Sequence, residues 1–143
     1  MNHRGLIGGL VLIGLISTSA VAQNTLGELL DAGGKKLSKK EVQDLLTGAH
    51  AVGPSASGAS TDYAYKANGQ FSGNLKNSEG WMTGVVGTWS VDDNGKMCAK
   101  WTLTSNSKRF DGCMFHYALS EQYYFSESDS DRASRVFKRT IKK

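Results

Sequence analysis

From residue 61 to the C-terminus, apolar and polar side chains alternate with a period of two, which is typical of β-strands that bury one face. The alternation includes Tyr63 and runs up to Asn68-Gly69, a dipeptide that strongly favours a two-residue hairpin turn. It resumes after the turn with Phe71. This segment therefore predicts an antiparallel hairpin.

The same pattern predicts more strands further along the chain. A second hairpin is expected around Asp93-Asn94-Gly95, with Trp81, Val85, Trp89 and Val91 on one phase before the turn and Met97, Ala99, Trp101 and Leu103 after it. Shorter runs follow at residues 113–119, 123–125 and 136–141. We predict a mainly β fold, in which about seven antiparallel strands form a meander over residues 61–143 that closes into a small barrel or a curved sheet.

A helical period appears only before the strands. Ser38 and Glu41 form the S/T-x-x-E capping box, and the apolar stripe behind it predicts a helix over residues 39–47. A shorter candidate around residues 26–32 is too short to be stable alone, so we expect residues 23–36 to form a mobile arm. Residues 48–60 have no period and many small residues. The stretch 23–60 is therefore expected to be a helical arm followed by a flexible loop.

Residues 1–22 have the pattern of a secretory signal peptide. Arg4 precedes a run of apolar and glycine residues over 5–16, and Ala20-Val21-Ala22 is a small-x-small cleavage site. The apolar run would span about 18 Å as a helix, too little for a bilayer core of about 30 Å. We expect cleavage after Ala22, a periplasmic or secreted protein, and no integral membrane span in the mature chain.

Export changes the chemistry expected of the two cysteines. Cys98 and Cys113 are the only pair, so outside the cytoplasm they are predicted to form one intramolecular disulfide. Their phases conflict, because Cys98 is on the polar phase of its strand and Cys113 on the apolar phase of its own. Either a β-bulge near Gly112 shifts the register, or Phe115 and Tyr117 face outward and form an aromatic surface.

Length, charge and motifs exclude several classes of function. A chain of 143 residues fits one domain, and a net charge of +4 without a dense Lys/Arg run does not predict nucleic-acid binding. Neither a nucleophile elbow nor a C-x-x-C pair is present. His116 is the one histidine in a predicted strand, and a lone histidine there is more often structural. We predict a protein that is not an enzyme and has no cofactor, no metal and no catalytic residues.

Aromatic side chains are the best candidates for ligand contact. A small barrel either fills its interior with them or uses them to line a concave site. Tyr124 is out of phase with its neighbours on both sides, so it is expected to face outward. The predicted ligand-binding residues are Trp81, Trp89, Trp101, Tyr124 and His116.

The order of several motifs suggests a family. Along the chain come Gln43-Asp44-Leu45-Leu46-Thr47-Gly48, Gly87-Thr88-Trp89-Ser90-Val91 and Asn94-Gly95-Lys96-Met97-Cys98, then Trp101 and Cys113. This order resembles a family of small exported bacterial proteins of unknown function, over residues 40 to 125. The resemblance implies a β-rich exported domain in which the Gly-x-Trp and cysteine positions are structural, and it implies no catalytic residue. Lipocalin-like barrels, including exported protease inhibitors, are similar in outline only.

Two functions are therefore expected from the sequence. In the first, the protein is an exported, non-enzymatic binding domain that recognises a small ligand, an envelope component or a protein partner. An apolar pocket lined by a tryptophan would favour it. In the second, it inhibits a secreted hydrolase by inserting the arm of residues 23–36 or the loop of residues 48–60 into the target's cleft.

Overall fold

The computed structural model describes residues 22–143, so the predicted signal peptide lies outside the described residues except for Ala22. These residues form a mainly β fold, as predicted. In chain order the elements are α1 (Leu26–Asp31), β1 (Lys35–Lys36), α2 (Lys39–Leu46), β2 (His50–Pro54), β3 (Ser60–Tyr65), β4 (Gln70–Lys76), β5 (Met82–Val91), β6 (Lys96–Leu103), β7 (Arg109–Leu119), β8 (Gln122–Ser126) and β9 (Phe137–Lys142).

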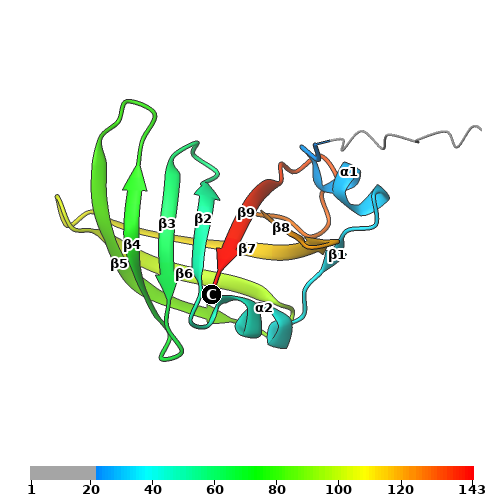
Figure 1. Cartoon of the computed structure of the whole chain (residues 1–143), viewed down its shortest axis with the longest axis horizontal. Coiled ribbons are helices and arrows are strands. Elements are labelled where there is room, and N and C mark those ends of the chain that lie inside the picture. The colour runs from blue at the N-terminus through cyan, green and yellow to red at the C-terminus, as the bar shows by residue number, and fades with distance from the viewer. Residues whose placement is uncertain (1–21) are drawn as a thin grey trace, which may run out of the picture.

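The strands from β2 to β9 form a closed eight-stranded antiparallel barrel (Figure 1). Each of them pairs with the next one in the chain, and β9 pairs back to β2 through Ala51 opposite Ile141. The closure confirms the predicted meander and selects the barrel over the open curved sheet. The two-residue strand β1 adds to β7 outside this closed ring.

Strand β2 corrects the loop predicted over residues 48–60. His50–Pro54 pairs with β3 on one side and with β9 on the other, so this segment is the seam that closes the barrel. Its inward positions are Ala51 and Gly53, which are too small to produce a visible apolar alternation. One of its two partner strands, β9, lies far away in the sequence, so no local pattern indicates that pairing.

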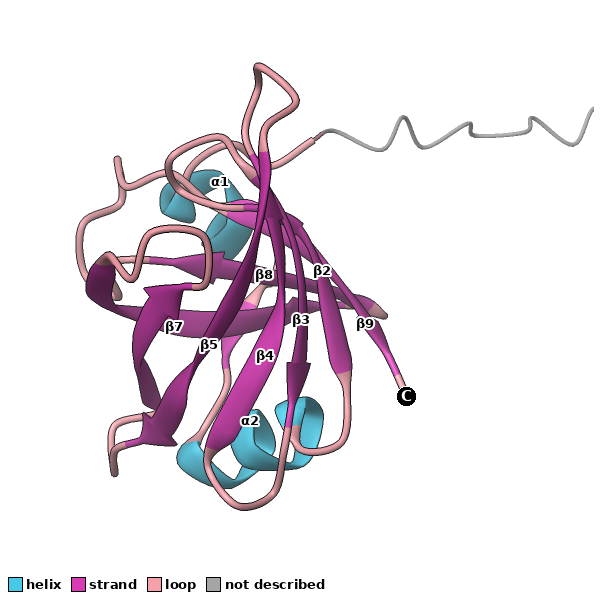
Figure 2. Cartoon of the chain, turned by 90° about the vertical axis from the view of Figure 1, so that its left-hand side faces the viewer, coloured by secondary structure: helices cyan, strands magenta, loops and turns pink. Residues whose placement is uncertain are grey.

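Helix α2 closes one end of the barrel. The predicted helix over residues 39–47 is confirmed at Lys39–Leu46, with Ser38 and Glu41 forming both hydrogen bonds of the capping box. Val42 and Leu46 have no exposed surface and pack against the inner face of the barrel. Figure 2 shows the helix beneath the strands, with the β4–β5 loop at the opposite end.

Helix α1 is packed against the barrel and does not form the mobile arm predicted from the sequence. Leu26 and Leu29 are completely buried, and the amide N–H of Leu26 donates to the carbonyl of Ser134 at 2.8 Å. The helix covers Tyr117 and Tyr124 on the outer face of the barrel. Tertiary contacts thus stabilise a helix that is too short to persist by itself.

The strand register removes the conflict between the two cysteines. Cys98 lies directly opposite Cys113 on β6 and β7, in an unbroken register and without a bulge near Gly112. The disulfide is therefore on the outer face, as are Phe115 and Tyr117 on the same phase of β7. Of the two alternatives given by the sequence, the one in which Phe115 and Tyr117 face outward is therefore correct. The outward aromatic surface is not exposed, however, because α1 covers it.

Candidate functional site

A cavity of about 700 Å³ lies inside the barrel on the loop side of the α2 plug. It begins at the β2–β3 loop, at residues 55–59, and at Asn77 and Ser78 of the β4–β5 loop. Apolar and aromatic side chains line most of its walls, among them Tyr63, Leu75, Met97, Trp101, Leu103 and Met114. Its volume is in the range of small-molecule sites, which are usually concave and mainly apolar.

Glycines inside the strands allow close packing in the wall of the barrel around this cavity. At Gly87, an added Cβ would lie 2.2 Å from the carbonyl oxygen of Lys100, so the backbones of β5 and β6 approach more closely than any other residue allows. At Gly112, an added Cβ would lie 3.4 Å from the ring of Trp101. The indole of Trp101 therefore lies across the inner surface of β7, where it also stacks on Phe110 with ring centroids 5.8 Å apart.

A buried charged side chain, that of Arg139, lies among these apolar walls. Arg139 on β9 is 5% exposed and lines the cavity, with its guanidinium carbon 4.3 Å from the centroid of the Phe125 ring. Within residues 22–143, its Nε has no hydrogen-bond partner and its guanidinium forms no ion pair with a carboxylate. Burial lowers the pKa of Arg139, while Tyr65 and Tyr63 oppose that change.

His116 lies on the inner phase of β7 but does not line the cavity. It is 2% exposed and lies opposite Phe125 in the β7–β8 register. Burial, with a smaller contribution from the charge of Arg139, lowers the pKa of His116 to about 3. Its Nδ1 has no hydrogen-bond partner among the described residues. His116 is thus a neutral ring in the core near Arg139 and presents no second cation to a ligand.

Of the five predicted ligand-binding residues, Trp101 alone lines the interior cavity. Trp89 packs near α2, and its Nε1–H donates to the carbonyls of Lys66 and Gln70 at 3.1 and 3.2 Å, so it holds the β3–β4 turn. Trp81 is 44% exposed just before β5.

Tyr124 faces outward, as its phase predicts, but it is not exposed. Its cross-strand partner is Tyr117, and both side chains lie under α1 with 5% and 1% exposure. Its hydroxyl donates to the side-chain oxygen of Gln122 at 2.8 Å. The outward ring of Tyr124 therefore packs under α1 and offers no exposed surface for a ligand.

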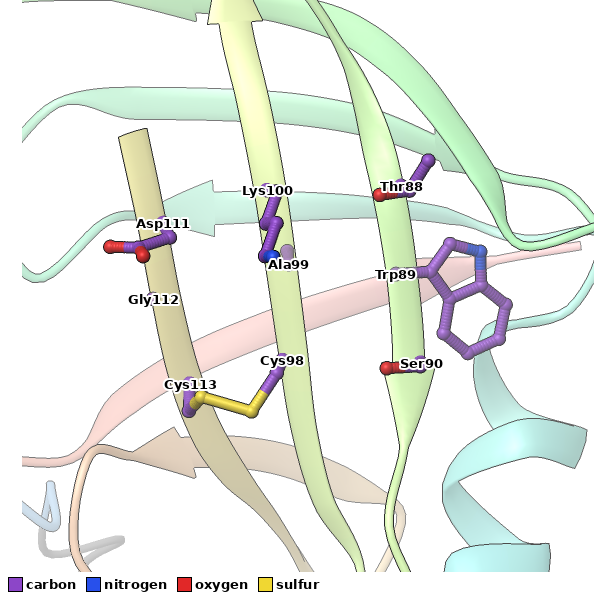
Figure 3. Close-up of a pocket in the computed structure, with 9 residues that line it drawn as sticks. All are labelled: Thr88, Trp89, Ser90, Cys98, Ala99, Lys100, Asp111, Gly112 and Cys113. Atoms are coloured by element: carbon purple, nitrogen blue, oxygen red, sulfur yellow. A yellow bond between two sulfur atoms is a disulfide. The ribbon is translucent and has the colours of Figure 1, made fainter. Parts of the chain in front are cut away.

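A second hollow, of about 650 Å³, lies on the sheet formed by β5, β6 and β7, next to the disulfide (Figure 3). Outward side chains such as Ser90, Lys100 and Asp111 border it. Figure 3 shows the Trp89 ring on the opposite side of β5 from the disulfide, and that ring belongs to the core. The hollow is a shallow outer surface without buried polar groups directed into it, so the interior cavity is the better candidate site.

Sequence reasoning missed Arg139. The signal for it was available, because Phe137, Arg139 and Ile141 share one phase of the last predicted strand. A charged residue on the phase of two apolar residues points inward when the strand is closed into a barrel. The basic surroundings, with Lys138 and Lys142 on the other phase, made Arg139 look like one more surface charge.

Residues 22–143 contain no group of three or more His, Cys, Asp or Glu side chains that could hold a metal ion. Neither helix in this range has the length and apolar content needed to cross a bilayer.

Comparison with known proteins identifies the family. The model of a family described as proteins of unknown function, DUF995, matches residues 12–142. The chain belongs to the DUF995 family. This match confirms the resemblance to a family of unknown function and extends it beyond residues 40 to 125. No curated protein and no solved structure is significantly similar to this DUF995 chain.

Proposed function

We propose that this DUF995 protein is a non-enzymatic binding protein that holds a small, mainly apolar ligand inside its barrel. The observation that supports the proposal most directly is the interior cavity of about 700 Å³, which lies on the loop side of α2 and is bordered by the β2–β3 and β4–β5 loops. If side chains filled the interior completely, the rim of the barrel or a surface for a protein partner would be the better candidate site. Trp101, the predicted residue on the cavity wall, is part of this proposed site.

The proposed location is the periplasm or the medium outside the cell. The Cys98–Cys113 disulfide is consistent with an extracytoplasmic protein, since disulfides persist in oxidising compartments. Both cysteines are on the outer face of the barrel, where cytoplasmic reductants would reach them. The proposal therefore requires a ligand that is taken up from outside the cytoplasm. It does not involve nucleic acid.

The alternative, an inhibitor of a secreted hydrolase, has less support. Its first version needs residues 23–36 to be free to enter a cleft, but Leu26 and Leu29 are buried against the barrel. Its second version needs the β2–β3 loop, and residues 55–59 of that loop border the cavity. No observation favours inhibition over ligand binding.

Titration with a neutral apolar fluorophore, N-phenyl-1-naphthylamine, tests the proposal. We expect its emission to rise on binding to the wild-type protein. Met114→Trp should weaken binding at least about tenfold, because the larger ring fills the cavity that Met114 lines. Lys100→Trp is the matched control, since it adds the same ring on the outer face of the neighbouring strand and should leave binding unchanged. Circular dichroism verifies that both variants fold.

Two results would contradict the proposal. One is a wild-type protein that gives no increase in emission. The other is a folded Met114→Trp variant that binds as tightly as Lys100→Trp, since that would place the fluorophore outside the barrel. Native mass spectrometry of the protein purified from its own envelope complements the titration, because a retained small molecule would identify the ligand directly.

A further inference from the structure

Arg139 carries a buried positive charge, and no negatively charged group among the described residues pairs with it. A guanidinium keeps its proton under all ordinary conditions, and a charge removed from water is costly unless it is paired. Arg139 is 5% exposed and has no carboxylate partner within residues 22–143. Its guanidinium lies over the Phe125 ring, a cation–π interaction that leaves the buried Nε–H without an acceptor among the described residues.

The neighbouring titratable groups do not provide that charge. Tyr63 and Tyr65 are the tyrosines that interact with Arg139, and a phenolate on either would neutralise it. Burial raises the pKa of Tyr63 to about 12 and also raises the pKa of Tyr65, so both hydroxyls keep their protons. His116 is neutral because burial lowers its pKa. The interior therefore contains one uncompensated positive charge and two protonated hydroxyl groups.

The backbone around Arg139 leaves its side chain free on the cavity side. Gly53 lies beside it on β2, and a Cβ added there would be 3.6 Å from Cδ of Arg139 and 2.7 Å from the carbonyl oxygen of Lys138. Because residue 53 has no side chain, the side chain of Arg139 can lie directly against the β2 backbone. The guanidinium lies in the wall of the same cavity as Leu75 and Trp101.

We propose that the ligand is an amphipathic carboxylate, whose two oxygens accept hydrogen bonds from Arg139 and whose apolar body lies against the aromatic and aliphatic walls. This inference rests on the proposed function and specifies its ligand. A carboxylate is planar and has two acceptor oxygens, which match the parallel N–H groups of a guanidinium better than a single acceptor does. Ligand binding would thereby remove the cost of the unpaired buried charge.

The experiment compares two ligands that differ only in the head group, dodecanoate and 1-dodecanol, each added below the concentration at which it aggregates. Displacement of N-phenyl-1-naphthylamine from the wild-type protein measures both affinities. We expect dodecanoate to bind at least about tenfold more tightly than 1-dodecanol. In Arg139→Met, which keeps a long apolar side chain without the charge, the two affinities should agree within about threefold.

Two carboxylates near the cavity mouth define the control. Asp111 and Glu127 also line the cavity, and both are exposed. Glu127→Gln removes one of these charges without touching Arg139. It should keep the preference for dodecanoate or increase it, because a competing negative charge is lost. If Glu127→Gln abolished the preference, the acid and not Arg139 would set the head-group specificity, and the inference would be overturned.

The outcomes separate this inference from the proposed function. If neither ligand binds to the wild-type protein and the fluorophore is not bound either, the proposed function fails. If both ligands bind equally well to the wild-type protein, the interior still binds apolar molecules and the role of Arg139 is overturned. The wild-type comparison needs no variant, so it remains decisive if Arg139→Met does not fold. Arg139→Lys then keeps the charge, and it should retain part of the preference.

Discussion

Individual residues inside this barrel fall into two groups according to whether the fold satisfies their polar atoms. Trp89 and Arg139 are both buried at inward positions of their strands. The indole N–H of Trp89 donates to two backbone carbonyls, whereas Nε of Arg139 has no acceptor in the described chain. Buried polar groups are nearly always hydrogen-bonded in folded proteins. Trp89 is therefore satisfied by the fold itself, whereas Arg139, which also lines the cavity, is the residue to which the proposed carboxylate ligand would bind.

His116 should make stability depend on pH in a defined window. Its pKa is about 3 in the fold and 6.5 ordinarily, so the unfolded chain takes up a proton that the folded chain does not. The stability contributed by its neutral form is complete above about pH 6.5 and is lost progressively as the pH falls from there toward about 3. Between about pH 7.5 and pH 5, we expect the free energy of unfolding to fall by about 2 kcal/mol from this group.

Urea unfolding of the wild-type protein and of His116→Phe across this range measures the effect. The variant should lose the pH dependence, because phenylalanine has no proton to gain. His50→Gln is the matched control, since it removes an exposed histidine in place of the buried one, and it should keep the wild-type slope. Equal slopes in the wild-type protein and His116→Phe would contradict the burial of a neutral His116.

Among individual residues, agreement between residue type and phase predicted the wall position of Trp101, but the same agreement wrongly suggested Trp81 and Trp89, which do not line the cavity. Trp101 is an aromatic side chain on an apolar phase, so its position on the cavity wall was expected. Arg139 is a charged side chain on an apolar phase, and its type argued for the surface. For Tyr124, the phase predicted the outward direction correctly. Its burial could not be predicted, because the helix that covers it, α1, lies about a hundred residues earlier in the chain.

At the scale of elements, α1 acts as a cover for one side of the barrel. Leu29→Ala should lower the free energy of unfolding by about 3 kcal/mol, because it removes a fully buried side chain and leaves a cavity. Leu30→Ala, one position along the same helix, should cost about 1 kcal/mol, since Leu30 is half-buried and the change in helix propensity is identical. Urea unfolding compares the two variants. Equal and small losses would mean that α1 is detached from the barrel in solution.

Elements with a local signal were predictable, and those that depend on distant partners were not. Helix α2 has a capping box and an apolar stripe, and the β3–β4 hairpin has its Asn68-Gly69 turn. Strand β2 has neither, since its inward residues are small and its partner β9 is the last strand of the chain. Helix α1 does have a capping box, but its stability comes from buried contacts with β7 and β8 that no local pattern indicates.

At the scale of the whole molecule, the barrel has two unequal ends and two unequal faces. Helix α2 fills one end, and the positively charged amine of the last residue, Lys143, donates to the carbonyls of Asp44 and Thr47 at the end of that helix. The other end is bordered by loops. The inner face contains the cavity and Arg139, whereas the outer face carries the disulfide. Access to the cavity and covalent stabilisation are thus located in different parts of the molecule.

Because the disulfide and the cavity are on different faces of the barrel wall, we expect loss of the disulfide to lower stability but not ligand affinity. The bond closes a loop with a sequence separation of 15, so replacing both Cys98 and Cys113 by Ser should lower the free energy of unfolding by about 3 kcal/mol. Because the bond lies on the outer face and the strand register does not depend on it, the affinity for N-phenyl-1-naphthylamine should change by less than about threefold. Urea unfolding and the fluorophore titration measure the two quantities on the same sample.

The reduced wild-type protein is the matched control, because it lacks the bond but keeps both sulfurs. It should agree with the double variant in stability and in affinity. A folded double variant that no longer binds the fluorophore, while the reduced wild-type protein still does, would assign binding to the outer hollow beside the cysteines. The interior cavity predicts the opposite pattern. Affinity is lost with Met114→Trp, which fills the cavity, and is retained when the disulfide is removed, because the Cys98–Cys113 bond lies on the outer face of the wall to which Cys113 contributes.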